Sequence, residues 1–128
     1  MINRTVGLVA VAMLLHGNQC NGDHASKASG AECPDAQTLD WENFGETFAT
    51  DYCTSCHSAS LTGAARNGAP AGVDYDSLMA VRAGAEVMDT HAAAGPDSVN
   101  QLMPPAGSPQ PTLEERELLG EWLACSAP

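Results

Sequence analysis

The chain has few aromatic residues, few basic residues and no apolar run long enough to cross a bilayer. Aromatic side chains make up 5% of its 128 residues, so they can fill only a small hydrophobic core. A small domain of this kind depends on a disulfide, a metal or a bound apolar group for stability. Lys and Arg number 5 against 16 Asp and Glu, and the net charge of -11 makes nucleic acid and anionic membranes poor partners.

The longest apolar run, residues 6–15, follows the positive charge of Arg4 and is typical of a signal peptide. It is too short for a permanent transmembrane helix, which needs about 20 apolar residues. We therefore expect residues 1–19 to be removed on export to the bacterial periplasm or cell envelope. Five cysteines in so short a chain also favour an oxidising compartment.

Cys20 lies where bacterial lipoproteins carry their acylated cysteine, although the three residues before it depart from the usual pattern. A lipid anchor at Cys20 and ordinary signal-peptidase cleavage between Gln19 and Ala31 therefore both stay open. Residues 20–37 are small and polar without a hydrophobic period, which predicts a flexible tether. Residues 38–128 remain as the folded domain.

The stretch Cys53-Thr54-Ser55-Cys56-His57 has the spacing of a site for covalent haem attachment. Two thiols three positions apart lie on one side of a helical turn, so both can form thioethers with one edge of a porphyrin. His57 follows the second thiol directly, which makes its imidazole the proximal ligand of the iron. We therefore expect one haem c, attached through Cys53 and Cys56.

Two other kinds of site use paired cysteines, and the rest of the sequence disfavours both. A thioredoxin-like redox pair begins a helix after a strand, and nothing upstream of Cys53 alternates as a strand does. A structural zinc site needs four ligands, usually as two spaced pairs, whereas Cys33, His91 and Cys125 are scattered singly. The positions of Cys33 and Cys125 near the two ends of the domain suggest a disulfide, although sequence alone does not give the connectivity.

The loop 58–74 after the motif is rich in glycine and proline, so regular structure is not expected there. Such a loop can wrap the proximal side of a haem and offer a backbone carbonyl near Pro70 to the second imidazole nitrogen of His57. Arg66 is the one cation of the loop and a candidate partner for a haem propionate. An exposed, unpaired arginine is the alternative.

Met103 is the candidate for the distal ligand of the iron. Pro104 forces it into an extended conformation and Pro105 stiffens the chain beyond it, so a rigid loop would present the thioether. The segment lies far enough beyond His57 to pass around a haem edge. A methionine buried in a proline turn is the alternative, and His91 is a second candidate ligand if the loop is displaced.

Three helices are predicted around these residues. The first begins near Asp40 and runs towards the motif, and Gly45 within it marks a place where another helix crosses closely. The second spans 74–91. The third follows Thr112, which forms a capping box with Glu115. The apolar faces of the three helices comprise Trp41, Phe44 and Phe48, then Leu78, Val81, Ala85 and Met88, then Leu118, Leu119, Trp122 and Leu123.

Together these features resemble the small class I c-type cytochromes. The likeness covers roughly residues 38–124 and is carried by the Cys53-Thr54-Ser55-Cys56-His57 motif after a helix with Gly45, the Met103-Pro104-Pro105 loop and a terminal helix with Trp122. It implies an all-α bundle of about three to four helices wrapped around one covalently bound haem. It also implies single-electron transfer between membrane-associated redox enzymes.

The chain departs from the better-known members because it has no lysine-rich docking face. We therefore expect redox protein partners with a basic docking surface, or, alternatively, carboxylates that serve solubility alone. Ligation by His57 and Met103 leaves the iron no open position, which favours an electron carrier over an enzyme. The alternatives are a haem-based sensor or peroxidase-like module with a displaceable Met103, or the electron-entry subunit of a larger oxidoreductase.

Overall fold

The structure is a computed structural model that describes residues 27–126, so the expected signal peptide and Cys20 lie outside it. Within this range the chain forms α-helices and no β-strand, with one isolated bridge between Ala94 and Val99, which confirms the all-α class. None of these helices is long and apolar enough to cross a membrane. The elements are η1 (Trp41–Gly45), α1 (Glu46–Tyr52), η2 (Gly63–Arg66), α2 (Leu78–Ala83), α3 (Ala85–Ala92) and α4 (Leu113–Ser126).

A π-helical turn, η1, and α1 form one helical segment that begins at Asp40, as predicted. The Asp40 side chain accepts the backbone N–H of Asn43 at 2.7 Å, and the Asn43 side chain accepts the backbone N–H of Asp40 at 2.9 Å. Gly45 then lies against Trp122 of α4, where a Cβ atom would stand 2.5 Å from the indole ring. The missing side chain therefore permits the close helix crossing that the sequence predicted.

The single helix predicted over 74–91 is wrong, because the structure has two helices, α2 and α3, that meet at Gly84. The ring of Tyr75 occupies the space beside this glycine, 2.8 Å from where a Cβ atom would stand. The backbone of Gly84 leaves the helical region at φ -108° and ψ 11°. The predicted apolar stripe is nevertheless buried at Val81, Ala85 and Met88.

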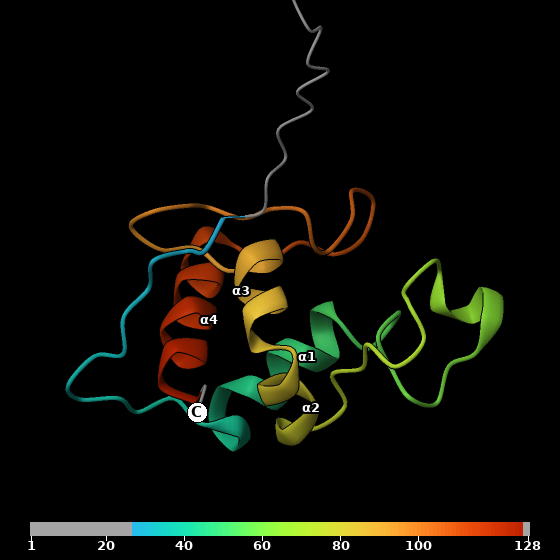
Figure 1. Ribbon diagram of the computed structural model, residues 1–128, viewed down its shortest axis with the longest axis horizontal. Coiled ribbons are helices and arrows are strands. Elements are labelled where there is room, and N and C mark those ends of the chain that lie inside the picture. Colours follow the sequence, from blue (N-terminus) through green and yellow to red (C-terminus); the bar gives the residue numbers. More distant parts are fainter. Residues whose placement is uncertain (1–26, 127–128) are drawn as a thin grey trace, which may run out of the picture.

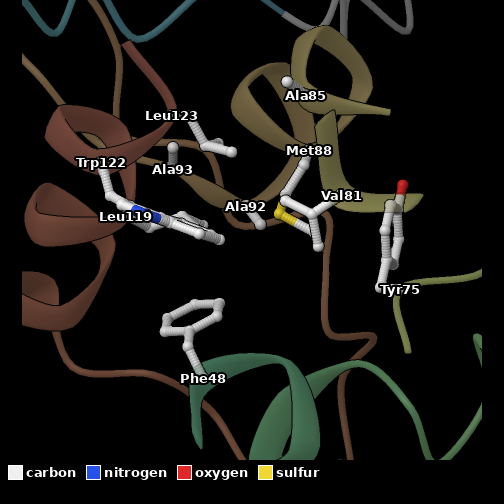
Figure 2. Close-up of a cluster of buried hydrophobic side chains, with 10 residues drawn as sticks. All are labelled: Phe48, Tyr75, Val81, Ala85, Met88, Ala92, Ala93, Leu119, Trp122 and Leu123. Carbon is white, nitrogen blue, oxygen red and sulfur yellow. The ribbon is translucent and has the colours of Figure 1, made fainter. Parts of the chain in front are cut away.

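Helices α3 and α4 run side by side, and their apolar faces form the core together with Phe48 and Tyr75 (Figures 1 and 2). Leu119 and Trp122 of α4 are 0% and 1% exposed. The ring of Trp122 meets Phe44 edge to face with centroids 5.8 Å apart. The scarce aromatic side chains are thus concentrated at the crossing of η1 and α1 with α4, where each buries a large apolar area.

The predicted capping box begins α4. The Thr112 hydroxyl accepts the backbone N–H of Glu115 at 3.2 Å, and the Glu115 carboxylate accepts the backbone N–H of Thr112 at 2.7 Å. These bonds to Thr112 lower the pKa of the carboxyl group of Glu115. Its other oxygen accepts the hydroxyl of Tyr52 at 3.0 Å, so the start of α4 is tied to the end of α1, directly before the cysteine motif.

Residues 27–37, the strap, belong to the segment 20–37 that was predicted as a flexible tether, whose residues 20–26 lie outside the described residues. Ser29 and Ala31 of the strap are docked on α3 and α4. Ser29 is 1% exposed, and both its backbone N–H and its hydroxyl donate to the carboxylate of Asp89 on α3. Gly120 of α4 makes room for the strap, because a Cβ atom there would stand 2.9 Å from Cβ of Ala31. This part of the strap is therefore packed against the helices, whereas residues 32–36 are exposed.

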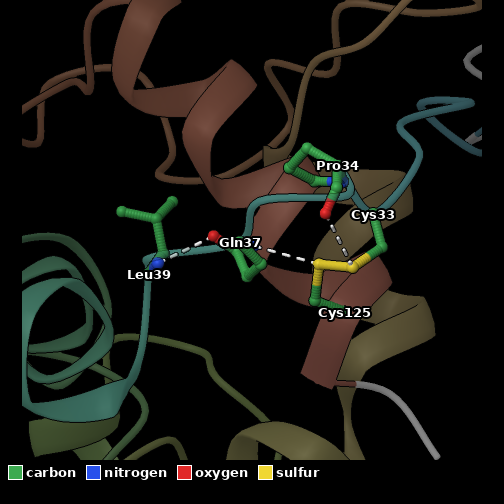
Figure 3. The surroundings of a disulfide bond; sticks show 5 residues. All are labelled: Cys33, Pro34, Gln37, Leu39 and Cys125. Carbon is green, nitrogen blue, oxygen red and sulfur yellow. Dashed lines mark hydrogen bonds between the residues drawn. A yellow bond between two sulfur atoms is a disulfide. The ribbon is translucent and has the colours of Figure 1, made fainter.

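The strap is joined to the end of α4 by a disulfide between Cys33 and Cys125, which confirms the predicted pair (Figure 3). The two cysteines are 92 positions apart. The side-chain amide of Gln37 donates to Sγ of Cys125 at 3.0 Å, and its oxygen accepts the backbone N–H of Leu39 at 2.7 Å. These contacts lead the chain from the strap into the first helical segment.

We expect the Cys33–Cys125 bond to contribute about 4 kcal/mol to the free energy of unfolding, because it closes a long loop in the unfolded chain. Replacing both cysteines by serine should lower the stability by about this amount in a denaturant titration. Mass spectrometry under non-reducing conditions should recover both cysteines in one linked peptide. Free, alkylatable thiols at both positions would contradict the bond.

Candidate haem-binding site

The cysteine motif continues the last turn of α1. The backbone N–H groups of Cys53 and Thr54 both donate to the carbonyl of Ala49 at 2.9 Å. The N–H of His57 then donates to the carbonyl of Cys53 at 2.8 Å. A helical turn therefore carries the two thiols and the imidazole, as the spacing predicted.

Two adjoining hollows lie beside the motif. The larger has a volume of about 200 Å³, and its lining includes Cys53, Cys56, His57, Pro70 and Met103. The smaller, of about 40 Å³, shares Cys53, His57 and Met103 with it and adds His91. The structure thus brings together the thiols, the imidazole and the thioether that the sequence singled out, although Met103 is far from the motif along the chain.

A backbone carbonyl orients the imidazole of His57. Its Nδ1 lies 2.9 Å from the oxygen of Val73. A carbonyl oxygen can only accept, so Nδ1 carries the proton and Nε2 keeps the lone pair that can bind a metal. A carbonyl near Pro70 was predicted as the acceptor, and the acceptor is that of Val73, three positions beyond Pro70. The Pro70 carbonyl itself accepts from Arg66 at 2.7 Å.

Arg66 differs from both predictions made for it, because it is 5% exposed and organises the loop in which it lies. Its guanidinium donates five hydrogen bonds to backbone carbonyls, those of Ser58, Leu61, Ala69, Pro70 and Val73. The carboxylate of Asp74, with Oδ1 2.9 Å from Nη2 of Arg66, balances the charge of the guanidinium. A guanidinium has five N–H donors, and these bonds use all five, so none remains for a haem propionate.

Met103 is held by its backbone while its side chain is 38% exposed, so the alternative of a buried methionine is wrong. Its N–H donates to the carbonyl of His91 at 2.9 Å. Its carbonyl accepts from the guanidinium of Arg116 at 2.8 Å. Both backbone groups of the candidate ligand are therefore engaged with the rest of the domain.

Arg116 supports the segment around Met103 and was not predicted from the sequence. It is 2% exposed in α4, and it also donates to the carbonyls of Ala92 at 2.8 Å and Asn100 at 3.0 Å. Its second terminal nitrogen donates to the side chain of Gln110 at 3.0 Å, and the amide of Gln110 donates to Pro104 at 3.0 Å. Arg116 thus holds the segment around Met103 much as Arg66 holds the loop around Val73.

The helical spacing of Arg116 was the signal that could have revealed it. Its flanking glutamates suggest a solvent-facing position, but it lies three positions before Leu119 and seven before Leu123, on the apolar face of α4. Burial lowers the pKa of its guanidinium, which nevertheless remains a cation at neutral pH.

The two free thiols do not suit the alternatives of a redox pair or a zinc site. Burial raises the pKa of the Cys53 thiol to about 12, whereas a redox pair needs a thiolate at neutral pH. Cys33 and Cys125 are consumed by their disulfide. Across residues 27–126, no three side chains of His, Cys, Asp or Glu gather as a metal site would require.

Removing the guanidinium of Arg116 should destabilise the domain, because buried carbonyls would lose their donor. We expect Arg116→Leu to lower the free energy of unfolding by about 3 kcal/mol in urea. The matched control is Arg82→Leu, which removes an exposed arginine from α2 and should change stability by less than about 0.5 kcal/mol. Equal stabilities of the two variants would show that Arg116 does not hold the Met103 segment.

The residues fit a c-type haem by the chemistry of their donors. Two thiols and an imidazole lie on one helical turn, the lone pair of the imidazole is free, and a thioether lines the same hollows. These are the groups that anchor and ligate such a haem. The chain matches no family model, no curated protein and no solved structure.

Proposed function

We propose that the protein is an exported electron carrier with one haem c, attached to Cys53 and Cys56 and ligated by His57 and Met103. The observation that carries the proposal is the meeting of these four side chains in one hollow. A bound haem supplies one-electron chemistry at its iron. The residues of the chain hold it, orient its ligands and limit access to it.

Each face of the proposed site has its own support. The carbonyl of Val73 holds the Nδ1–H of His57 at 2.9 Å, which selects the tautomer with a free Nε2. On the other candidate ligand, Arg116 and His91 restrain the backbone of Met103. With histidine and methionine as ligands no iron position is open to a substrate, and methionine favours the reduced state. This supports a carrier rather than an enzyme.

The charge distribution supports fast, transient encounters with a basic partner. The lining of both hollows contains no Asp, Glu, Lys or Arg, so a partner would touch an uncharged surface there. Removal of residues 1–19 deletes Arg4 and no acidic residue, which changes the net charge from -11 to -12. Long-range attraction raises the rate of encounter more than it raises the affinity of the complex. We therefore propose redox proteins with a basic surface, in the periplasm or cell envelope, as partners.

A second candidate, a haem-based sensor or peroxidase-like module, is favoured by the position of His91. Nδ1 of His91 lies 3.0 Å from the hydroxyl of Thr90. The residue lines the smaller hollow beside Met103. If Met103 left the iron, His91 would be an acid–base group near the open position.

Ligation by Met103 predicts the weak near-infrared charge-transfer band of iron–sulfur coordination in the oxidised protein. Met103→Ala should abolish the band, whereas Met79→Ala, which removes a methionine that is 72% exposed on α2, should keep it. Persistence of the band without Met103, or its dependence on His91, would overturn the distal assignment. Carbon monoxide binding to the reduced protein at neutral pH would favour the second candidate over the carrier.

Electrostatic steering predicts that the second-order rate of electron transfer with a basic partner falls as salt is added. The reach of the field shrinks to about 8 Å at physiological ionic strength, so attraction by the distant carboxylates is screened. Stopped-flow measurements from low to physiological salt test this. A rate that stays flat over that range would mean that the acidic residues serve solubility alone.

A further inference from the structure

His57 and Arg66 donate to the same carbonyl oxygen. The oxygen of Val73 accepts Nδ1–H of His57 at 2.9 Å and an Nη2–H of Arg66, also at 2.9 Å. Both bonds can form at once because a carbonyl oxygen has two lone pairs. Hydrogen bonds in a buried network polarise one another. When two donors share one carbonyl oxygen, each weakens the hydrogen bond that the other makes.

Arg66 is held in this position by the rest of its loop. Four further carbonyls accept from its guanidinium, the shortest contacts being those with Ser58 and Pro70 at 2.7 Å. Hydrogen bonds from an ionised donor are roughly twice as strong as neutral ones. The hydrogen bond from Arg66 to the Val73 oxygen is therefore a stable feature of the folded loop.

We propose that Arg66 is a positioning residue that acts on the haem through Val73 and His57 and raises the reduction potential. This inference rests on the proposed function. A carbonyl oxygen that forms a strong hydrogen bond with Nδ1–H gives the imidazole partial anionic character, which stabilises oxidised iron. Because Arg66 weakens that acceptor, His57 stays closer to a neutral imidazole, and the reduced state is favoured.

The charge of Arg66 alone does not explain such an effect. Asp74 lies 2.9 Å from the guanidinium, and the two side chains are 6% and 22% exposed. The two charges of the pair sum to zero, so removing both side chains leaves the local net charge unchanged. The pair therefore allows a hydrogen-bond effect to be separated from a Coulomb effect.

The test compares the haem-loaded protein with a charge-balanced double variant, Arg66→Met with Asp74→Asn. We expect its reduction potential to shift to lower values and the Nδ1–H resonance of His57 to move downfield in NMR spectra of the reduced protein. A purely Coulomb role predicts opposite shifts in the two single variants that cancel in the double variant. A merely structural role lowers stability without moving that resonance.

Arg66→Lys keeps the charge without the planar fork, so it tests the same point if the double variant does not hold haem. It should lower the potential with unchanged ligand absorption bands, while Arg82→Met, at an exposed site on α2, should alter neither potential nor resonance. A wild-type potential together with an unmoved Nδ1–H resonance in the double and Lys variants would overturn the proposal. Wild-type protein without covalent haem would overturn the proposed function, and this inference with it.

Discussion

Two buried guanidinium groups hold together the two largely irregular segments beside the candidate axial ligands, residues 58–74 after His57 and the segment around Met103. Carbonyl groups buried in a loop need donors, and loops without helices or strands supply few of their own. Arg66 provides five such bonds after His57, and Arg116 provides three around Met103. Each candidate axial ligand thus depends on one arginine that gathers backbone carbonyls near it.

The remainder of the fold compensates for a small core. The loop after His57 projects away from the helices in Figure 1, so its internal bonds to Arg66 provide much of its order. The strap and the Cys33–Cys125 bond tie the two ends of the domain together. A chain with so few aromatic side chains gains from such cross-links, and a bound porphyrin would add apolar bulk at the hollows.

Local patterns predicted the helix caps at Asp40 and Thr112. The positions of Gly45 and of the two remaining cysteines also predicted two long-range contacts, the helix crossing and the Cys33–Cys125 pair. Spacing also singled out the donors that meet in the larger hollow. The sequence did not predict the acceptor for His57, the burial of Arg66 or the docked strap. These depend on how irregular segments fold back, and such segments carry no periodicity from which contacts can be inferred.

The central claim is that the chain carries a haem attached through Cys53 and Cys56. It is tested most directly by the mass and the optical spectrum of protein exported from a strain with the haem-attachment machinery. We predict a mass larger by one haem that persists under denaturing conditions, a c-type spectrum, and loss of both when the two cysteines are replaced by alanine. A protein without haem, in which both thiols of the motif can be alkylated, would contradict this claim.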